Sequence, residues 1–302
     1  MLSFSAQVKE ELCATITDRD REFACLYGLL LCGRQLRDSE ICLQSESTAL
    51  TQLIPQLFRR VFQAQVQVTV RQNGALYTYT VEDPAQVRLV TDTYKIKLPA
   101  RTLERNNIVT NSLGAFTAGA FLSCGSVIDP NKEYHLEFAL PCAELQDAFA
   151  EILLAIGVTA KCILRKGLPV LYVKSSEQIE DLLTFMGAQQ ATIDFINIEI
   201  LKNVRNKANR IINCDMANIN KVMQAAERQI RDILVIDERL GLDALSSELQ
   251  EMALLRLENP ELSLKELGEL METPIGRSGV NHRLKKLGEI AAFLLEQAPE
   301  AE

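Results

Sequence analysis

Two hydrophobic patterns alternate along the chain up to about residue 190, and only one of them continues beyond it. Apolar residues that alternate with polar ones are typical of half-buried strands, whereas a recurrence every three to four residues is typical of amphipathic helices. The first part of the chain contains both patterns, and the remainder contains only the helical one. We therefore expect an α+β domain over residues 1–190, followed by an all-α region.

Within this first part the order of elements αββαββα occurs twice. The two copies come into register when Gly33 is laid on Gly125, and each of these glycines follows a predicted helix. In the first copy this helix runs from about Asp20 to Cys32. We expect a duplicated domain with repeats over about 1–95 and 96–190, whose sheets lie side by side.

Two glycines indicate hairpins inside the repeats. Asn73-Gly74 follows an alternating strand pattern, and both residue types tolerate the positive φ angles of a type I′ turn. In the second copy two short apolar segments bracket Gly167 in the same way. Each repeat is therefore expected to contain a two-stranded hairpin near its end.

The all-helical region has readable boundaries. Residues 191–214 are rich in basic side chains and are interpreted as a linker. After Asp215 an amphipathic helix is expected to run to about Gly241, and a further helix is expected from about Ser246 to Leu257. The apolar stripe of the first of these helices consists of Ile219, Val222, Ala226, Ile230 and Ile233. The C-terminal domain is thus predicted over 215–302.

Near the end of the chain, two helices separated by a short break predict a helix-turn-helix over about 263–296. Ser263 and Glu266 have the spacing of a capping box, which opens a helix to about Met271. Thr273-Pro274-Ile275-Gly276 breaks that helix, and a second one begins near Ser278. Its apolar stripe is Val280, Leu284, Leu287, Ala291 and Leu294. The break of about six residues is longer than the usual turn of this motif.

Positive charge is concentrated in two places although the chain carries a net charge of −8. Between Glu199 and Arg231 there are seven basic and three acidic residues, and from Ile275 to Gly288 there are four basic residues and no acid. Acidic residues gather between Asp237 and Glu261. Local positive patches on an acidic protein are what a surface facing phosphate groups requires.

Polar and basic side chains at the start of the last helix are the principal DNA-binding candidates. In a helix-turn-helix the second helix lies in the major groove, where such side chains reach phosphates and base edges. The candidates are Ser263, Lys265, Arg277, Ser278, Asn281, His282, Arg283, Lys285 and Lys286. A second group is Lys202, Arg205, Lys207 and Arg210. In both groups the charges could instead be merely solvated.

Metal sites, cofactors and membrane spans are not expected. The eight cysteines never form a C-x-x-C pair and are interpreted as small core residues that stay reduced. With only two histidines, the chain cannot build a Cys/His zinc site at finger spacing. No apolar run approaches the roughly 20 residues needed to cross a bilayer. We expect a cytoplasmic protein.

Several sequence motifs together resemble one family. T-A-G-A-F-L-S-C-G, over residues 117–125, is similar to the L-A-G-L-I-D-A-D-G helix of homing endonucleases, and C-L-Y-G-L-L-L-C-G, over 25–33, is a weaker counterpart. With F-S-A-Q-V-K-E-E-L, R-N-K-A-N-R-I-I-N-C-D-M-A-N, S-L-K-E-L-G-E-L and S-G-V-N-H-R-L-K-K-L, they resemble the WhiA family. This resemblance implies a degenerate homing-endonuclease domain, a helix-turn-helix, and a regulator of transcription linked to sporulation, cell division and chromosome segregation.

The resemblance also shows where a nuclease site would lie. Active homing-endonuclease motifs place an acidic residue before the final glycine, and the pair binds divalent metal. Those positions are Cys32 and Cys124 in this chain, and a thiol is a poor ligand for magnesium, which prefers hard oxygen donors. We therefore expect no catalysis and no metal.

Three functions remain in competition at this stage. The first is a sequence-specific binder of double-stranded DNA, associated with the nucleoid. The second is an active metal-dependent endonuclease. The third is an interaction scaffold in cell division, in which the N-terminal domain binds other regulatory or division proteins and DNA contact is weak. The N-terminal domain carries acidic residues such as Glu82, Asp83 and Glu133, which suggests that its sheets no longer bind DNA. The oligomeric state and the operator sequence stay open.

Overall fold

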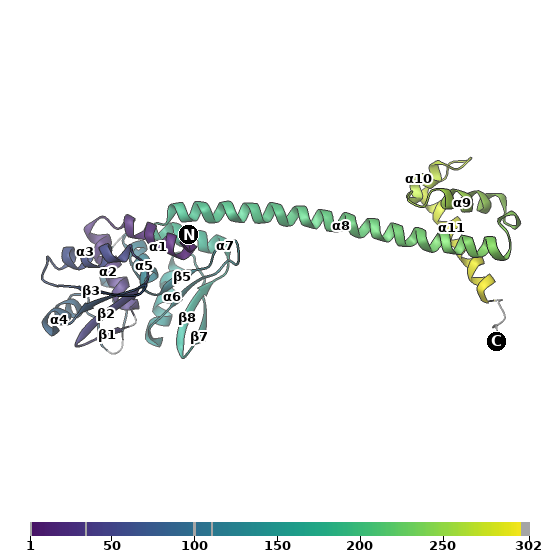
Figure 1. The fold of residues 1–302 in the computed structure, drawn as a ribbon. Helices are drawn as coiled ribbons and strands as arrows, with labels where there is room; N and C mark the ends of the chain where they lie inside the picture. The colour runs from purple at the N-terminus through teal and green to yellow at the C-terminus, as the bar shows by residue number, and fades with distance from the viewer. Residues whose placement is uncertain (1, 34, 99–100, 110, 297–302) are drawn as a thin grey trace. The chain divides into compact units, whose positions relative to one another are not determined.

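The computed structural model describes residues 2–33, 35–98, 101–109 and 111–296. The chain divides into two compact units, Met1–Val204 and Arg205–Glu302, called here the N-terminal unit and the C-terminal unit. Figure 1 shows the order of the elements in each unit. No helix of the described ranges is both long and apolar enough to span a membrane.

The N-terminal unit consists of a leading helix and two copies of the αββαββα order, which confirms the predicted duplication. The leading helix is α1 (Phe4–Thr15). The first copy comprises α2 (Arg19–Cys32), β1 (Gln35–Arg37), β2 (Glu40–Ser45), α3 (Leu50–Val61), β3 (Thr69–Asn73), β4 (Leu76–Val81) and α4 (Pro84–Thr93). The second comprises α5 (Leu113–Cys124), β5 (Gly125–Val127), β6 (Leu136–Ala139), α6 (Gln146–Ala155), β7 (Lys161–Arg165), β8 (Leu168–Val173) and α7 (Ser176–Met186).

Each copy forms its own antiparallel sheet of four strands, with the orders β1-β2-β4-β3 and β5-β6-β8-β7. The two orders are equivalent, because β5 to β8 take the places of β1 to β4. Short 3-10 turns, η1 (Arg105–Asn107) and η2 (Ala143–Leu145), complete the unit. The α+β class and the repeat were therefore both predictable from hydrophobic pattern alone.

The hairpin turns differ in type from the prediction. Asn73 pairs with Leu76, so the central turn residues are Gly74 and Ala75, and of these only Gly74 has a positive φ, of 61°. A single positive φ at the first central residue is the geometry of a type II′ turn, so the predicted type I′ turn at Asn73-Gly74 is wrong. In the second copy Lys166 and Gly167 both have positive φ, as a type I′ turn requires.

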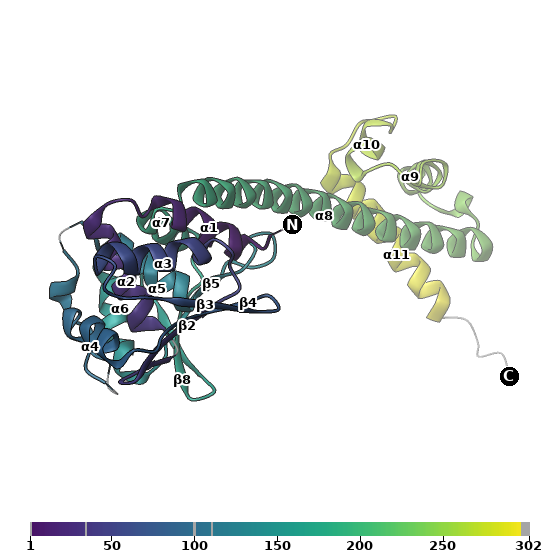
Figure 2. The ribbon, with the colours of Figure 1, turned by 60° about the vertical axis from the view of Figure 1, so that its left-hand side comes forward.

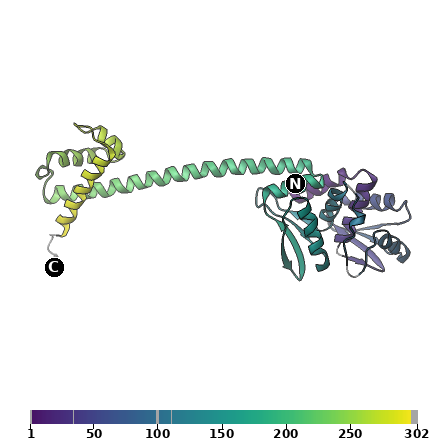
Figure 3. The ribbon, with the colours of Figure 1, turned by 180° about the vertical axis from the view of Figure 1, so that it is seen from behind.

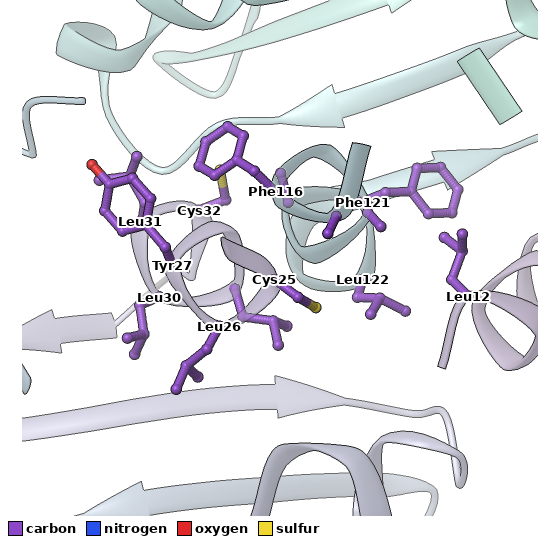
Figure 4. Packing of buried hydrophobic residues seen from close by; sticks show 14 of the residues in the cluster. Leu12, Cys25, Leu26, Tyr27, Leu30, Leu31, Cys32, Phe116, Phe121 and Leu122 are labelled. Carbon is purple, nitrogen blue, oxygen red and sulfur yellow. The ribbon is translucent and has the colours of Figure 1, made fainter. Parts of the chain in front are cut away.

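Two glycines allow the helices α2 and α5 to approach backbone to backbone. A Cβ atom added to Gly119 would lie 2.0 Å from the Cys25 carbonyl oxygen, and one on Gly28 would lie 2.2 Å from that of Phe116. Figure 4 shows the two helices side by side between the strands of the two copies. Gly28 and Gly119 thus form the contact at the centre of the unit.

Helix α8 (Gln189–Arg239) is joined at its start to α1 and α7 by hydrogen bonds that involve acidic side chains of the N-terminal unit. Glu11 of α1 accepts from the backbone N–H groups of Gln190 and Ala191 at 2.7 and 2.9 Å, so it caps the helix. Nearby, burial together with a hydrogen bond to Glu199 raises the pKa of Glu180 to about 7. The Ser176 hydroxyl donates to Glu199 at 2.6 Å, which joins α7 to α8 at this pair.

The C-terminal unit is all helical, as predicted. After α8 come η3 (Leu242–Ala244), α9 (Ser247–Glu258), α10 (Leu264–Glu269) and α11 (Arg277–Glu296). Its core joins α8, α9, α10 and α11 through Ile233, Ile236, Met252, Ala253, Leu267, Met271, Val280, Leu284, Leu287 and Ala291. In Figures 2 and 3 α11 crosses the C-terminal part of α8, and α9 and α10 lie together on one side.

Three expectations about this region and its cysteines need correction. The expected helix start after Asp215 is wrong, because α8 begins at Gln189 and the predicted linker over 191–214 contains no glycine or proline to interrupt it. In the predicted apolar stripe Ile219 and Val222 are exposed, since burial on this part of α8 begins at Ala226 and the core of the C-terminal unit includes α8 only from Ile233 onwards. Cys162 and Cys214 are exposed rather than buried.

The close approach of α2 and α5 makes Gly119 sensitive to a single added methyl group. We expect Gly119→Ala to lower the free energy of unfolding of the N-terminal unit by about 3 kcal/mol, the upper end for overpacking, because backbone atoms cannot move aside as side chains do. Ser123→Ala, one turn along the same helix, serves as the control and should change stability little. Urea unfolding of the full chain followed by circular dichroism measures both, and equal stabilities would contradict this packing.

The Glu180–Glu199 pair predicts a pH dependence of the N-terminal unit. Because the pKa of Glu180 is raised in the folded state, stability from this group is present at low pH and is lost as pH rises from about 4.5 to about 7. Glu180→Gln should remove part of the loss in melting temperature between pH 5 and 8, whereas Glu151→Gln should not. Calorimetry of the three proteins would contradict the pair if all showed the same pH dependence.

Candidate nucleic-acid interface

The short helix α10 begins at a reciprocal cap. The Glu266 N–H donates to the Ser263 hydroxyl at 3.4 Å, and the Ser263 N–H donates to the Glu266 carboxylate at 2.8 Å. These bonds satisfy two backbone donors that the helix would otherwise leave open, and they lower the pKa of Glu266. The predicted capping box is confirmed, and it establishes where the first helix of the motif begins.

The segment between α10 and α11 is long, but it folds back on α10. The Ile275 N–H donates to the Gly268 carbonyl oxygen at 3.1 Å. A Cβ atom on Gly268 would lie 2.2 Å from the carbonyl oxygen of Ile275, so only glycine allows this approach. The contact sets where α11 can begin, and it explains how a break of seven residues, 270–276, still acts as a defined turn.

Helix α11 is divided into a buried and an exposed face. Val280, Leu284, Leu287 and Ala291 are at most 4% exposed, whereas Leu294 is half-buried. The opposite face carries the exposed side chains of Arg277, Ser278, Asn281, His282, Lys285 and Lys286. Six of the candidates named from sequence therefore lie on the solvent side of the second helix, at its N-terminal half.

Arg283 lies elsewhere. Its guanidinium group contacts Glu248 of α9 at 3.4 Å and donates to the sulfur of Met271 at 3.3 Å, and its side chain is only 18% exposed. Position 283 falls between the buried stripe and the solvent face of the helix, so the side chain turns towards α9. It holds α9 to α11, and we do not count it in the exposed face.

Two ion pairs reduce the positive charge of this surface only slightly. Lys265 lies 3.7 Å from Glu269, and Lys285 lies 3.7 Å from Glu289. The two lysine side chains are 79% and 74% exposed. Exposed pairs of this kind contribute about 0–1 kcal/mol and are screened by salt, so both lysines can exchange their partner for a phosphate.

The candidates from α10 and α11 meet at one pocket of about 480 Å³. Ser263, Lys265, Arg277 and Asn281 line it together with Lys221 of α8 and Arg256 of α9. A role for Lys221 and Arg256 was not predicted from the sequence. The position of Arg256 could have been recognised from the sequence, because it lies one helical turn after Met252 on the apolar face of its helix. A charged residue is rarely buried on such a face unless it has a partner or a function.

The second basic group is not uniform. The Lys202 ammonium, in the N-terminal unit, donates to the Pro130 carbonyl oxygen at 2.9 Å and lies 4.5 Å from the centre of the Tyr134 ring. Arg205, Lys207 and Arg210, in the C-terminal unit, are exposed on α8. Lys202 is thus engaged within the fold, while the other three are accessible.

In the N-terminal unit, Cys32 and Cys124 meet at the ends of α2 and α5, where the sequence analysis places the former acidic pair. A hydrogen bond that the Cys32 thiol donates to Cys124, together with complete burial, raises the pKa of Cys32. Two cations flank the thiols. Arg101 donates to the Leu31 and Gly33 carbonyl oxygens, and Lys9 donates to that of Leu122 at 3.4 Å. Figure 4 shows Cys32 among apolar side chains.

These residues do not fit a divalent metal. Thiols are poor ligands for magnesium, which prefers hard oxygen donors, and a guanidinium and an ammonium at the helix ends repel a cation. Their positive charges also interact favourably with the negative, carbonyl ends of the two helices. Within the described ranges no cluster of three or more His, Cys, Asp or Glu side chains could hold a metal ion.

Comparison with known proteins agrees with both units. Residues 113–205 match the model of the WhiA LAGLIDADG-like domain, and residues 208–291 match the WhiA C-terminal HTH domain. A curated protein of Lachnoclostridium phytofermentans, named "Probable cell division protein WhiA", is 40% identical over 96% of this chain and 98% of its own. The chain belongs to the WhiA family. A WhiA protein of the same name from Clostridium tetani is 34% identical over 98% of this chain and 99% of its own.

Solved WhiA structures share the fold. The full-length DUF199/WhiA of Thermotoga maritima is 26% identical, with a TM-score of 0.59 over 97% of this chain and 99% of that one. A structure of the N-terminal LAGLIDADG domain of DUF199/WhiA is 22% identical, with a TM-score of 0.50 over 62% of this chain and 91% of that one. The predicted fold class, a duplicated LAGLIDADG-like domain followed by a helix-turn-helix domain, is thereby confirmed.

The approach at Gly268 predicts a sensitive position in this WhiA helix-turn-helix. Gly268→Ala should lower the free energy of unfolding of the C-terminal unit by about 1–3 kcal/mol, because the methyl group meets the Ile275 backbone. Gly276→Ala is the matched control, since nothing lies within 4 Å of a Cβ atom there. Thermal unfolding of the full-length variants separates the two. The turn geometry would be refuted if Gly268→Ala were tolerated as well as Gly276→Ala.

Proposed function

We propose that this protein is a sequence-specific, non-catalytic binder of double-stranded DNA that regulates transcription in cell division, chromosome segregation or sporulation. The observation that carries the proposal is the exposed N-terminal face of α11, with Arg277, Asn281, His282, Lys285 and Lys286. No acidic residue occurs in α11 before Glu289. DNA binding of this kind would associate the protein with the nucleoid, in the cytoplasm.

The chemistry of this face suits the major groove. A recognition helix contacts base edges with residues near its N-terminus, while basic side chains contact phosphates. Asn281 offers the amide that pairs with adenine in a bidentate manner, and Arg277 could pair with guanine. Lys285 and Lys286 supply charge without base preference. The division into reading and anchoring residues is what separates specific from non-specific binding.

The proposal that the LAGLIDADG-like domain does not cleave DNA rests on the ends of α2 and α5. Hydrolysis in this fold would require carboxylates that hold divalent metal between the two helices. In their place are two thiols flanked by Lys9 and Arg101. We propose that this unit keeps the scaffold for a structural or partner-binding purpose.

Substitutions on α11 should separate the roles of its side chains. Asn281→Ala should reduce discrimination between cognate and unrelated DNA by about 1–3 kcal/mol. Lys286→Ala should weaken binding to both DNAs alike and reduce the slope of log affinity against log salt by about 1. Fluorescence anisotropy titrations at several salt concentrations measure both effects, with genomic fragments enriched by the bound protein as cognate DNA.

Two further variants make this test selective. Arg231→Ala removes an exposed charge from α8 and should leave discrimination unchanged. Arg283→Ala should act mainly through the stability of the C-terminal unit, because it loses the contacts to Glu248 and Met271. If Asn281→Ala and Lys286→Ala both bound as the unaltered protein does, α11 would not be the reading helix.

Incubation with supercoiled plasmid tests the absence of cleavage. With magnesium or manganese present, we expect no linear or nicked product above that formed by the buffer, because Cys32 and Cys124 offer no hard oxygen ligands. Agarose gel electrophoresis over a time course is the measurement. A metal-dependent increase in linear plasmid would overturn the argument from these two cysteines.

A further inference from the structure

The pocket of about 480 Å³ in the C-terminal unit is lined by three helices besides α11. From α8 come Lys221, Val222, Ala225 and Gln229, and from α9 comes Arg256. The start of α10 contributes Ser263, Leu264 and Lys265, and α11 contributes Arg277 and Asn281. Its volume falls within the range of small-molecule sites, of about 300–1,000 Å³.

The charge of the lining is of one sign. Lys221, Arg256, Lys265 and Arg277 are cationic, and none of the residues that line the pocket is acidic. Among the described carboxylates, only Glu269 forms an ion pair with one of these cations, at 3.7 Å from the exposed Lys265. Four positive charges around one hollow produce a field that attracts an anion, because each adds to the same potential.

Arg256 is the least expected member of this group. It is 2% exposed, and its Nη1 atom donates to the Leu262 carbonyl oxygen at 2.8 Å, with longer contacts to those of Asn259 and Pro260. Its Nε atom is buried and has no hydrogen-bond partner in the described part of the chain. Burial lowers the pKa of Arg256, and the charge of Glu261 raises it in part. A buried cation without an ion pair is costly unless a counter-charge arrives.

Gln229, which also lines the pocket, has an unsatisfied polar atom as well. Its Oε1 atom is buried and lacks a donor among the described residues. Buried polar atoms in native proteins are nearly always satisfied, and both of these unsatisfied atoms belong to side chains that line the same pocket. Val222, Ala225 and Leu264 add an apolar portion to the lining. The occupant therefore combines an anionic group, a hydrogen-bond donor and some apolar surface.

We propose that this pocket binds a phosphate group that is attached to a sugar or a similar organic body. A phosphate offers several strong acceptor oxygens to Lys221, Lys265 and Arg277, and Arg–phosphate contacts can be bidentate. A hydroxyl of the attached sugar can donate to Gln229, and its carbon atoms can lie on Val222 and Leu264.

Two sources supply this chemistry, the DNA backbone and a free nucleotide. For the DNA source the inference rests on the proposed function, because Arg277 and Asn281 belong to both the pocket and the exposed face of α11. A bound backbone phosphate would fix the start of α11 against the duplex. For the nucleotide source the pocket would sense a small molecule beside the reading helix.

The test uses the full chain and two single substitutions on α8. Lys221→Met removes one cation from the pocket but keeps the length of the side chain. Arg231→Met removes a charge from the same helix at an exposed position outside the pocket. Melting temperatures first establish that both variants fold. Inorganic phosphate and AMP are then titrated at constant ionic strength, with chloride as the reference anion, and DNA affinity is measured from low to high salt.

Two results support the proposal, and each identifies a source. If the pocket takes a backbone phosphate, Lys221→Met reduces the slope of log affinity against log salt by about 0.9, and Arg231→Met has a smaller effect. If it takes a free nucleotide, phosphate or AMP binds to the unaltered protein and to Arg231→Met, and Lys221→Met weakens this binding by roughly tenfold.

The inference is overturned if Lys221→Met and Arg231→Met have equal salt slopes and neither phosphate nor AMP binds above chloride. A failure of the proposed function is distinguishable from this result. If the unaltered protein binds no DNA, the proposed function is rejected. Titration with phosphate and AMP alone then tests whether the pocket binds a phosphate compound.

Discussion

Burial of one apolar stripe on α11 determines which of its side chains meet the solvent. Val280, Leu284, Leu287 and Ala291 pack into the core formed with α8, α9 and α10. Each of the three larger side chains stabilises the packed helix by about 1.5–3 kcal/mol relative to exposure, whereas the exposed Lys285–Glu289 ion pair of the same helix contributes about 0–1 kcal/mol. The stripe therefore determines the rotation of α11, and Arg277, Lys285 and Lys286 are exposed as a consequence.

A similar constraint shapes the N-terminal unit through a different contact. Gly28 and Gly119 bring the backbones of α2 and α5 together, and this places Cys32 beside Cys124 at the helix ends. The unit thus has the close helix contact of the fold but lacks the carboxylates that a nuclease would need at these positions. The glycines therefore preserve the packing of the two helices, whereas two thiols, Lys9 and Arg101 occupy the position where a nuclease would bind its metal.

Local sequence signals were sufficient for the class of fold and for the capping box, because each depends on residues a few positions apart, and the repeat followed from the same order of elements occurring twice. Properties that depend on distant segments escaped these signals. Nothing local to Arg283 reveals that Glu248 and Met271 lie beside it. In the same way, the buried charge of Arg256 and its place beside Lys221 depend on how α8 and α9 cross. The length of α8 was missed for a different reason, because basic composition was taken as the property of a linker.

The central claim, that the exposed face of α11 contacts DNA, is tested most directly by site-specific photo-crosslinking. A photoreactive amino acid is placed at His282 on this face or at Phe293, which is 58% exposed and lies about three turns further along α11. Irradiation of the full-length protein with bound DNA should crosslink the duplex from position 282 and not from position 293. Crosslinks from 293 alone, or from neither position while DNA remains bound, would contradict the account.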